Sequence, residues 1–105
     1  MSEFSQVVTT TDSAADAERL ARGIVEARLG ACAQIVGPIR SVYRWDGEIR
    51  VEPEWQLVVK TRTALVPELV AHLTARHGYD VPEVVATPIV DGNPGYFAWV
   101  RAETE

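Results

Sequence analysis

Two long strand-like stretches, residues 31–45 and 48–62, meet at Asp46-Gly47 and constrain the fold more than any other feature of this sequence. Asp-Gly is a strong signal for a two-residue hairpin turn, because both central positions of that turn need a positive φ angle. At ~3.3 Å per residue each strand could reach about 50 Å, whereas a compact domain of this length is only about 33 Å across. Gly37-Pro38 and Pro53 interrupt the strands and predict a bulge or an edge position in each. Part of the hairpin is therefore expected to project beyond the core.

The projecting part of the hairpin carries large apolar side chains, namely Tyr43, Trp45, Ile49, Val51 and Trp55. A lone two-stranded ribbon is only marginally stable in water, and this one would expose aromatic surface and unpaired strand edges. Two arrangements would remove that exposure. Copies of the chain could lay their hairpins against one another around an axis, or the hairpin could curl back onto its own sheet. The first arrangement is the one we expect.

The segment before the hairpin predicts a strand followed by a helix. Residues 4–11 are rich in valine and threonine, which favours a strand. Ser13 begins a capping box with Asp16, an arrangement that satisfies free N–H groups at a helix start. Gly30 is placed to end this helix in a left-handed conformation. The apolar side chains that recur at helical spacing, and that should face the core, are Ala17, Leu20, Ala21, Ile24 and Val25.

The segment after the hairpin predicts a second helix and a final strand. The helix covers residues 65–77 and ends at Gly78, the strand covers 83–90, and a turn cluster at 91–95 leads into a short terminal helix. The resulting β-α-β-β-α-β order is typical of an α+β, ferredoxin-like two-layer sandwich, here with a long β-hairpin and a short C-terminal helix. The chain is expected to form one domain, residues 1–105.

Composition argues against several classes of function. The chain has 10 basic and 15 acidic residues and no basic stripe, so it lacks the clustered positive charge that nucleic-acid binding needs. No apolar run is long enough to span a membrane, and no signal peptide is apparent. Cys32 is the only cysteine, which excludes an internal disulfide, and a buried structural thiol is favoured over a reactive one. A cytoplasmic location is expected.

Catalytic and metal-binding patterns are almost absent from the sequence. It contains no evident nucleophile–base pair, so a non-enzymatic protein is expected. His72 and His77 would point about 140° apart on a helix and could not share an ion. His77 and Glu83 lie on either side of the Gly78 turn and could meet as imidazole and carboxylate. The alternative is that His77 caps the helix and Glu83 orients it.

Several sequence blocks occur together and in a fixed order. They are residues 20–26, 29–35, 41–47, 60–61, 77–83 and 88–93, followed by Tyr96 and Trp99. In this order the blocks resemble the CutA family of divalent-cation tolerance proteins over nearly the whole chain. The resemblance implies a ferredoxin-like subunit, a stable homotrimer built from extended hairpins, and a role in tolerance to divalent metals, copper above all. It also implies a likeness to PII signalling proteins, with clefts between subunits.

The resemblance transfers two candidate metal ligands to this chain, His77 and Glu83. Family members credited with copper binding carry a cysteine in the first strand, where this sequence has Thr10. Arg76 stands where a second histidine can precede the family histidine, and Gly78 replaces the usual proline after it. Because two ligands make only a weak and exchangeable site, copper or another divalent cation is expected to bind weakly.

A second hypothesis follows from the likeness to PII proteins, namely a sensor that binds an anion or a metabolite in the cleft between subunits. The expected lining of that site is Lys60, Arg62, Tyr79 and Trp99. The aromatic residues could also serve core and interface packing instead of a ligand. A third hypothesis, a structural scaffold for a partner protein, stays open because nothing in the sequence names a partner.

Overall fold

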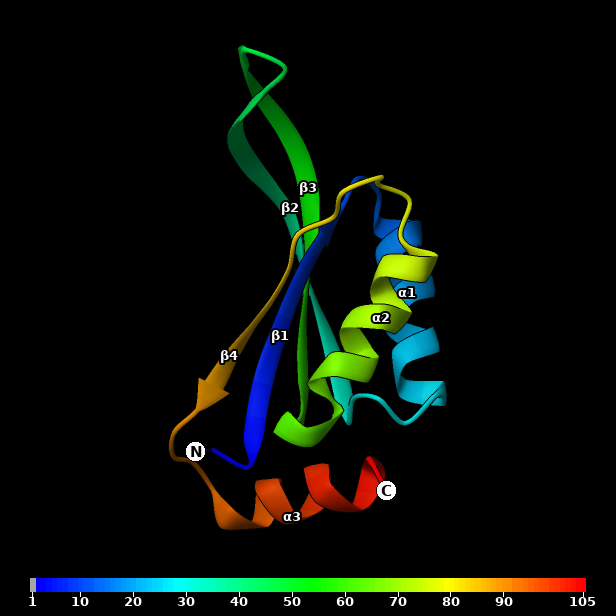
Figure 1. The fold of residues 1–105 in the computed structure, drawn as a ribbon, viewed down its shortest axis with the longest axis vertical. Helices are drawn as coiled ribbons and strands as arrows, with labels where there is room; N and C mark the ends of the chain where they lie inside the picture. Colours follow the sequence, from blue (N-terminus) through cyan, green and yellow to red (C-terminus); the bar gives the residue numbers. More distant parts are fainter. Residues whose placement is uncertain (1) are drawn as a thin grey trace.

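The computed structural model describes residues 2–105, which form one four-stranded sheet with helices (Figure 1). In chain order the elements are β1 (Phe4–Thr11), α1 (Ala14–Glu26), β2 (Cys32–Trp45), β3 (Glu48–Arg62), the 3₁₀ helix η1 (Thr63–Leu65), α2 (Val66–Arg76), β4 (Val84–Ile89) and α3 (Pro94–Glu103). This order confirms the predicted β-α-β-β-α-β arrangement with its C-terminal helix. No helix within the described part of the chain is long and apolar enough to cross a membrane.

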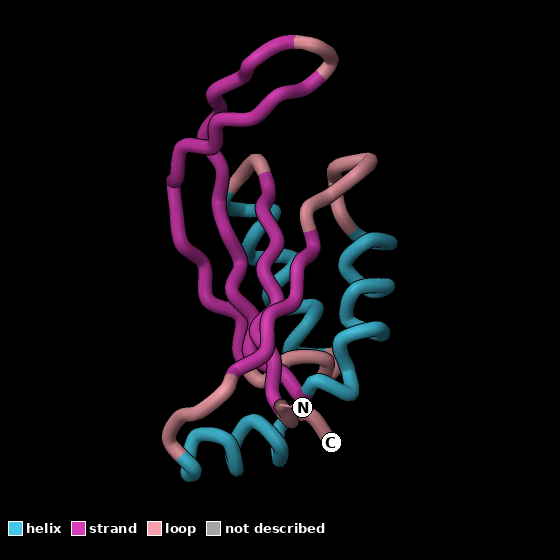
Figure 2. Tube along the Cα trace, turned by 60° about the vertical axis from the view of Figure 1, so that its left-hand side comes forward, coloured by secondary structure: helices cyan, strands magenta, loops and turns pink. Residues whose placement is uncertain are grey.

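The sheet has the strand order β2-β3-β1-β4, and every neighbouring pair of strands is antiparallel. α1 and α2 lie side by side over one face of the sheet, and α3 crosses its end far from the hairpin tip (Figures 1 and 2). Each of α1 and α2 joins two strands that have a third strand between them, so the two β-α-β units interlock. The α+β, ferredoxin-like fold is therefore confirmed.

The main core lies between the sheet and the two helices α1 and α2. Its fully buried large side chains are Val7, Leu20, Ile24, Leu57, Val59, Leu69 and Leu73. Burying a side chain of this size contributes roughly 1.5–3 kcal/mol, so this layer is a main source of the stability of the fold. A smaller cluster fastens α3 to the end of the sheet, where Phe97 stacks on Phe4 with ring centroids 4.7 Å apart.

Helix α1 begins as predicted and ends differently. The Ser13 hydroxyl caps its first turn by accepting the Asp16 N–H at 3.0 Å. The predicted left-handed end at Gly30 is wrong, because the left-handed residue is Arg28, with φ of 59°. Gly30 is instead required by close packing, since a Cβ there would lie 2.5 Å from Val59 Cγ1. The glycine lets the chain pass close to the sheet. Val25, which was expected to face the core, is exposed.

The hairpin projects beyond the body of the molecule, as its length predicted. Asp46 and Gly47 both have positive φ angles, 53° and 77°. β1 pairs with β3 only as far as the Thr11–Trp55 pair. Among the described residues, those at 39–54, here called the arm, therefore pair only with one another. The arm extends from the rest of the chain and bends near its tip (Figures 1 and 2). The longest dimension is 44 Å, and the radius of gyration is 14.2 Å against about 13 Å for a compact chain of this length.

Both predicted interruptions of the hairpin occur where they were expected. The register between β2 and β3 shifts between Val36 and Ile39, so Gly37-Pro38 forms an irregularity in the ladder. Pro53 pairs with Arg40 in the arm, where β3 has a neighbour on one side only. A proline has no N–H to donate, so it is tolerated at such an edge.

Candidate functional site

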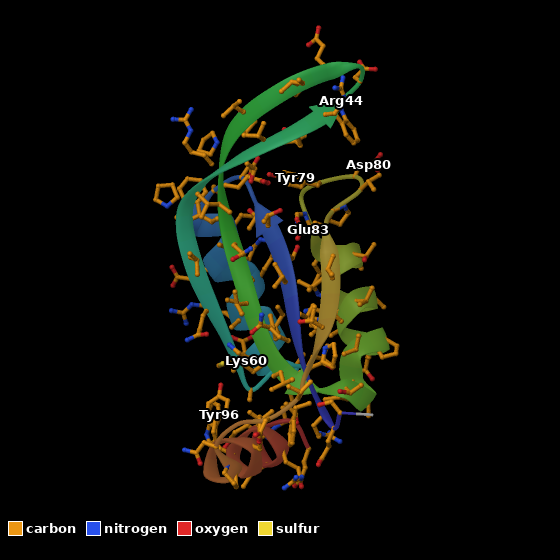
Figure 3. The ribbon with its side chains drawn as sticks, turned by 90° about the vertical axis from the view of Figure 1, so that its left-hand side faces the viewer. Arg44, Lys60, Tyr79, Asp80, Glu83 and Tyr96 are labelled. Carbon is orange, nitrogen blue, oxygen red and sulfur yellow. The ribbon has the colours of Figure 1, made fainter. Side chains whose placement is uncertain are left out.

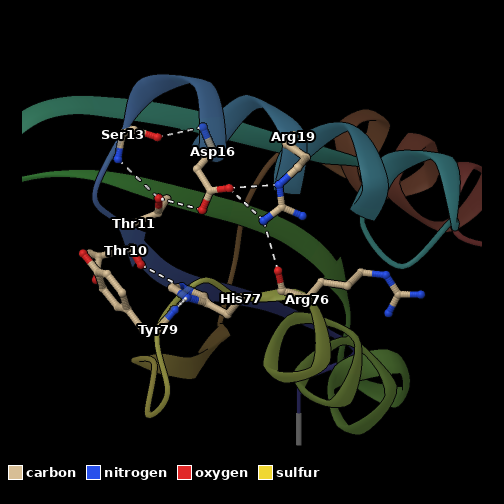
Figure 4. Close-up of polar contacts among 8 residues, drawn as sticks. All are labelled: Thr10, Thr11, Ser13, Asp16, Arg19, Arg76, His77 and Tyr79. Carbon is tan, nitrogen blue, oxygen red and sulfur yellow. Dashed lines mark hydrogen bonds and ion pairs between the residues drawn. The ribbon is translucent and has the colours of Figure 1, made fainter.

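His77 lies where α2 ends, and both of its ring nitrogens are engaged by the backbone (Figure 4). Nε2–H donates to the carbonyl oxygen of Thr10 at 2.8 Å, which ties the loop after α2 to β1. Nδ1 accepts the N–H of Tyr79 at 3.0 Å. Since a carbonyl can only accept and an amide N–H can only donate, these two bonds fix the neutral tautomer with its proton on Nε2. His77 therefore does more than cap a helix.

Tyr79 continues this set of contacts toward the arm. Its ring lies beside that of His77, with centroids 4.9 Å apart, and its hydroxyl donates to Glu54 Oε2 at 2.7 Å. Glu54 is only 9 % exposed, so the carboxylate has little water to replace this donor. Burial raises the pKa of Tyr79 well above its ordinary value, and the hydrogen bond to Glu54 adds to the rise. The tyrosine stays a neutral donor to a charged acceptor.

Glu83, the second candidate metal ligand, lies just before β4 and is exposed (Figure 3). Among the described residues no hydrogen bond or ion pair joins it to His77, and no three His, Cys, Asp or Glu side chains are grouped as a metal site. Thr10 stands where the family resemblance implied a cysteine, and its carbonyl oxygen already accepts from His77. These residues do not fit a ready-made metal site.

The residues predicted to line a ligand cleft divide between two ends of the sheet (Figure 3). Lys60 lies near α3, where its Nζ donates to Gln34 Oε1 at 2.9 Å, and Arg62 donates to the Thr104 hydroxyl at 2.9 Å. Tyr79 lies at the other end, on Glu54, which is about 20 Å from Lys60 along β3 at ~3.3 Å per residue. Within one chain, Tyr79 does not share a site with Lys60.

Trp99 lies at the α3 end of the sheet. At the same end Tyr96 contacts Cys32, a contact that the sequence did not predict. Tyr96 packs beside Trp99, with ring centroids 5.6 Å apart, and its hydroxyl lies 3.3 Å from the Cys32 sulfur. Burial, followed by this contact with Cys32, raises the pKa of Tyr96 to about 12. Cys32 is thus half-buried and paired with a phenol, in keeping with a structural thiol.

The two perturbed tyrosines predict how the protein responds to alkali. Their folded pKa values lie above the ordinary value of 10.0, so the unfolded chain releases these protons first. Stability should be intact below about pH 10 and should fall as the pH rises toward 12. Tyrosinate absorbance of native protein should accordingly rise at higher pH than that of denatured protein. Coincident curves for the two states would contradict the raised pKa values of Tyr79 and Tyr96.

Among the described residues, α3 is the helix that lies at the end of the sheet, and neither α1 nor α2 lies over the opposite sheet face (Figure 2). The strand register places Val8, Val36, Val58 and Val85 on this face, beside glutamines and Lys60. Val36 and Val85 lie on the two edge strands and are exposed, and Val8 and Val58 on the central strands between them are half-buried. The arm adds more apolar surface, with Trp45 56 % exposed and Ile49 66 % exposed. A sheet face and an arm of this kind are typical of a surface that another chain covers.

Comparison with known proteins gives a consistent result over nearly the whole chain. Residues 5–103 match the family described as CutA1 divalent ion tolerance protein. A divalent-cation tolerance protein CutA from Thermus thermophilus is 44% identical over 98 residues, which cover 93% of this chain and 95% of that protein. The chloroplastic protein CutA of Arabidopsis thaliana is 41% identical over 98 residues, 93% of this chain but 54% of that protein.

Solved structures agree with the sequence matches. The crystal structure of CutA1 from Oryza sativa superposes with a TM-score of 0.96 at 39% identity, covering 99% of this chain and 95% of that one. This chain spans about half the length of the plant and animal relatives that it matches, and nearly the full length of the Thermus protein.

Proposed function

Because this chain belongs to the CutA1 divalent ion tolerance family, we propose that it serves divalent-cation tolerance as a non-enzymatic, self-assembling protein. The observation that carries the proposal is the uncovered apolar surface of the arm and the open sheet face. The non-enzymatic part rests on the sequence, which has no nucleophile–base pair. A cytoplasmic location also remains a prediction from the sequence.

We propose a homotrimer as the assembled form. The accessible surface of the chain is 6400 Å², against about 5,800 Å² for a typical folded monomer of this mass, so the subunit presents surface in excess. The arm extends from the rest of the chain and pairs only with itself, so it adds to this surface, and a closed ring would leave no edge for further growth. The number three comes from the resemblance to the family, because the arm alone does not distinguish two copies from three.

Copper or another divalent cation is the proposed ligand, and we assign it no resident site. A cation at Nδ1 of His77 would have to displace the Tyr79 N–H, and Glu83 would have to move toward the ring. The sensor hypothesis also needs more than one subunit. Tyr79 and Trp99 lie at opposite ends of the sheet, so only a cleft between subunits could bring them together.

Isothermal titration with Cu²⁺ tests His77 as a ligand. We expect weak, exchangeable binding by the native protein and weaker binding by His77→Gln, because two ligands and a competing hydrogen bond leave little affinity. His72→Gln is the matched control, since this second histidine lies on α2 outside the candidate site. Equal binding by the native protein and His77→Gln would remove His77 from the site, as would an equal loss in the His72→Gln control.

A further inference from the structure

The arm leaves the body of the molecule at one pair of neighbouring residues in β3, Glu54 and Trp55. The last pairing between β1 and β3 joins Thr11 to Trp55, and beyond it β3 pairs with β2 alone. Side chains alternate between the two faces of a strand, so Glu54 and Trp55 point to opposite sides of the sheet. Any fixed direction of the arm has to be set at this exit.

Trp55 fastens the exit on the side that faces α1 and α2. It is half-buried and packs against the main core. Its ring also lies against the backbone of Gly37 in the neighbouring strand, where a Cβ would be 2.4 Å from Trp55 Cδ1. This contact holds β2 and β3 together just before both strands enter the arm.

Glu54 is fastened on the other side by a chain of four residues, Thr10, His77, Tyr79 and Glu54, here called the brace (Figure 4 shows its first three members). The Thr10 carbonyl accepts a hydrogen bond from Nε2–H of His77, and Nδ1 of His77 accepts the Tyr79 N–H. The Tyr79 hydroxyl in turn donates to Glu54. The brace therefore runs from the end of β1, through the loop after α2, to the base of the arm.

We infer that the brace fixes the direction in which the arm leaves the body, and that Tyr79 and His77 are positioning residues for the assembly proposed above. The bond to Glu54 is suited to this role, because a hydrogen bond to a charged acceptor is stronger than a neutral one and its loss leaves a buried carboxylate without a donor. The Tyr79–Glu54 hydrogen bond is separate from the sheet ladder, and it joins the base of the arm to the loop after α2. The inference rests on the proposed function, since a fixed arm matters most for a partner that it must meet.

Amide hydrogen exchange on the full chain tests the brace. We expect Tyr79→Phe to speed exchange of the arm amides, residues 39–54, about tenfold or more, because the variant removes one hydroxyl and leaves the ring packing intact. Tyr96→Phe is the matched control, since it removes the same group at the far end of the sheet and should leave arm exchange unchanged. Unchanged arm exchange in Tyr79→Phe, or equal acceleration in both variants, would overturn the brace.

Glu54→Gln distinguishes a specific hydrogen bond from a general structural role of Glu54, because it keeps an acceptor for the Tyr79 hydroxyl. A glutamine oxygen can still accept the Tyr79 hydroxyl, so this variant should speed arm exchange by no more than about threefold. Acceleration as large as in Tyr79→Phe would overturn the hydrogen-bond account. Light scattering on the same samples separates the brace from the proposed assembly. A monomeric native protein would contradict the assembly only, because all four members of the brace lie in one chain, whereas an oligomer with unaltered arm exchange would contradict the brace only.

Discussion

Replacing Trp45 and Ile49 together by aspartate should convert the proposed assembly into monomers. Both side chains lie near the hairpin tip and are more than half exposed on the subunit, so their removal should leave the fold of the subunit intact. In an assembly that covers the arm, each contributes roughly 1.5–3 kcal/mol through burial, and an aspartate there adds the cost of desolvating a charge. The two losses together should weaken association by at least about a hundredfold.

Light scattering measures this effect directly. The native protein should give about three times the subunit mass of 11.6 kDa, and the double variant should give one subunit mass. Val25→Glu is a suitable control, because it also replaces an exposed apolar side chain by an acid but lies on α1, away from the arm and the open sheet face. A native protein that is monomeric at micromolar concentration would contradict the proposed assembly.

Trp55 is left out of the double variant for a structural reason. The sequence groups it with the aromatic residues of the arm, but the structure places it at the exit, where it packs against the main core and against Gly37. An aspartate at Trp55 would damage the subunit and the assembly together, and the two effects could not be separated. The alternation of strand side chains decides this, since Trp55 shares its face of β3 with Leu57 and Val59.

The parts of the fold that the sequence predicts well are those governed by local rules. Asp46-Gly47 requires positive φ angles, and Ser13 supplies a cap within its own turn, so neighbouring residues contain the needed information. The length of the two strands then predicts an arm from simple geometry. Gly30 shows where local reasoning fails, because the role of this glycine depends on Val59, which is distant in sequence but close in space.

The candidate site was predictable only in part, for the same reason. The sequence indicated His77 and Tyr79, but not what they touch. The partner of the His77 ring is 67 residues away in β1, and the partner of the Tyr79 hydroxyl is 25 residues away in β3. Glu54 looks like an ordinary surface charge until the strand register and the loop path place Tyr79 upon it. No local pattern carries that information.

The two glycines of the α1 region should respond in opposite directions to the same substitution. Gly23 lies inside α1, and a Cβ there would meet nothing closer than His72 Nε2 at 3.7 Å, an ordinary contact distance. Gly23→Ala should therefore stabilise the protein by roughly 0.5–1 kcal/mol, because alanine has the higher helix propensity and loses less backbone freedom on folding. Denaturant unfolding at a fixed protein concentration measures the change and keeps any effect of assembly constant.

Gly30→Ala should destabilise the protein by roughly 1–3 kcal/mol, the usual cost of overpacking a core. The added methyl group would lie 2.5 Å from Val59 Cγ1 and 2.9 Å from Ile24 Cγ2, far inside contact distance. Neither neighbour can turn away easily, because both are fully buried and β-branched side chains are stiff at χ1. The steric clash could be removed only by a backbone shift of the segment between α1 and β2. This segment packs against the main core, so the shift would disturb the core. A Gly30→Ala variant with an unchanged or raised unfolding midpoint would refute the close approach of this segment to the sheet.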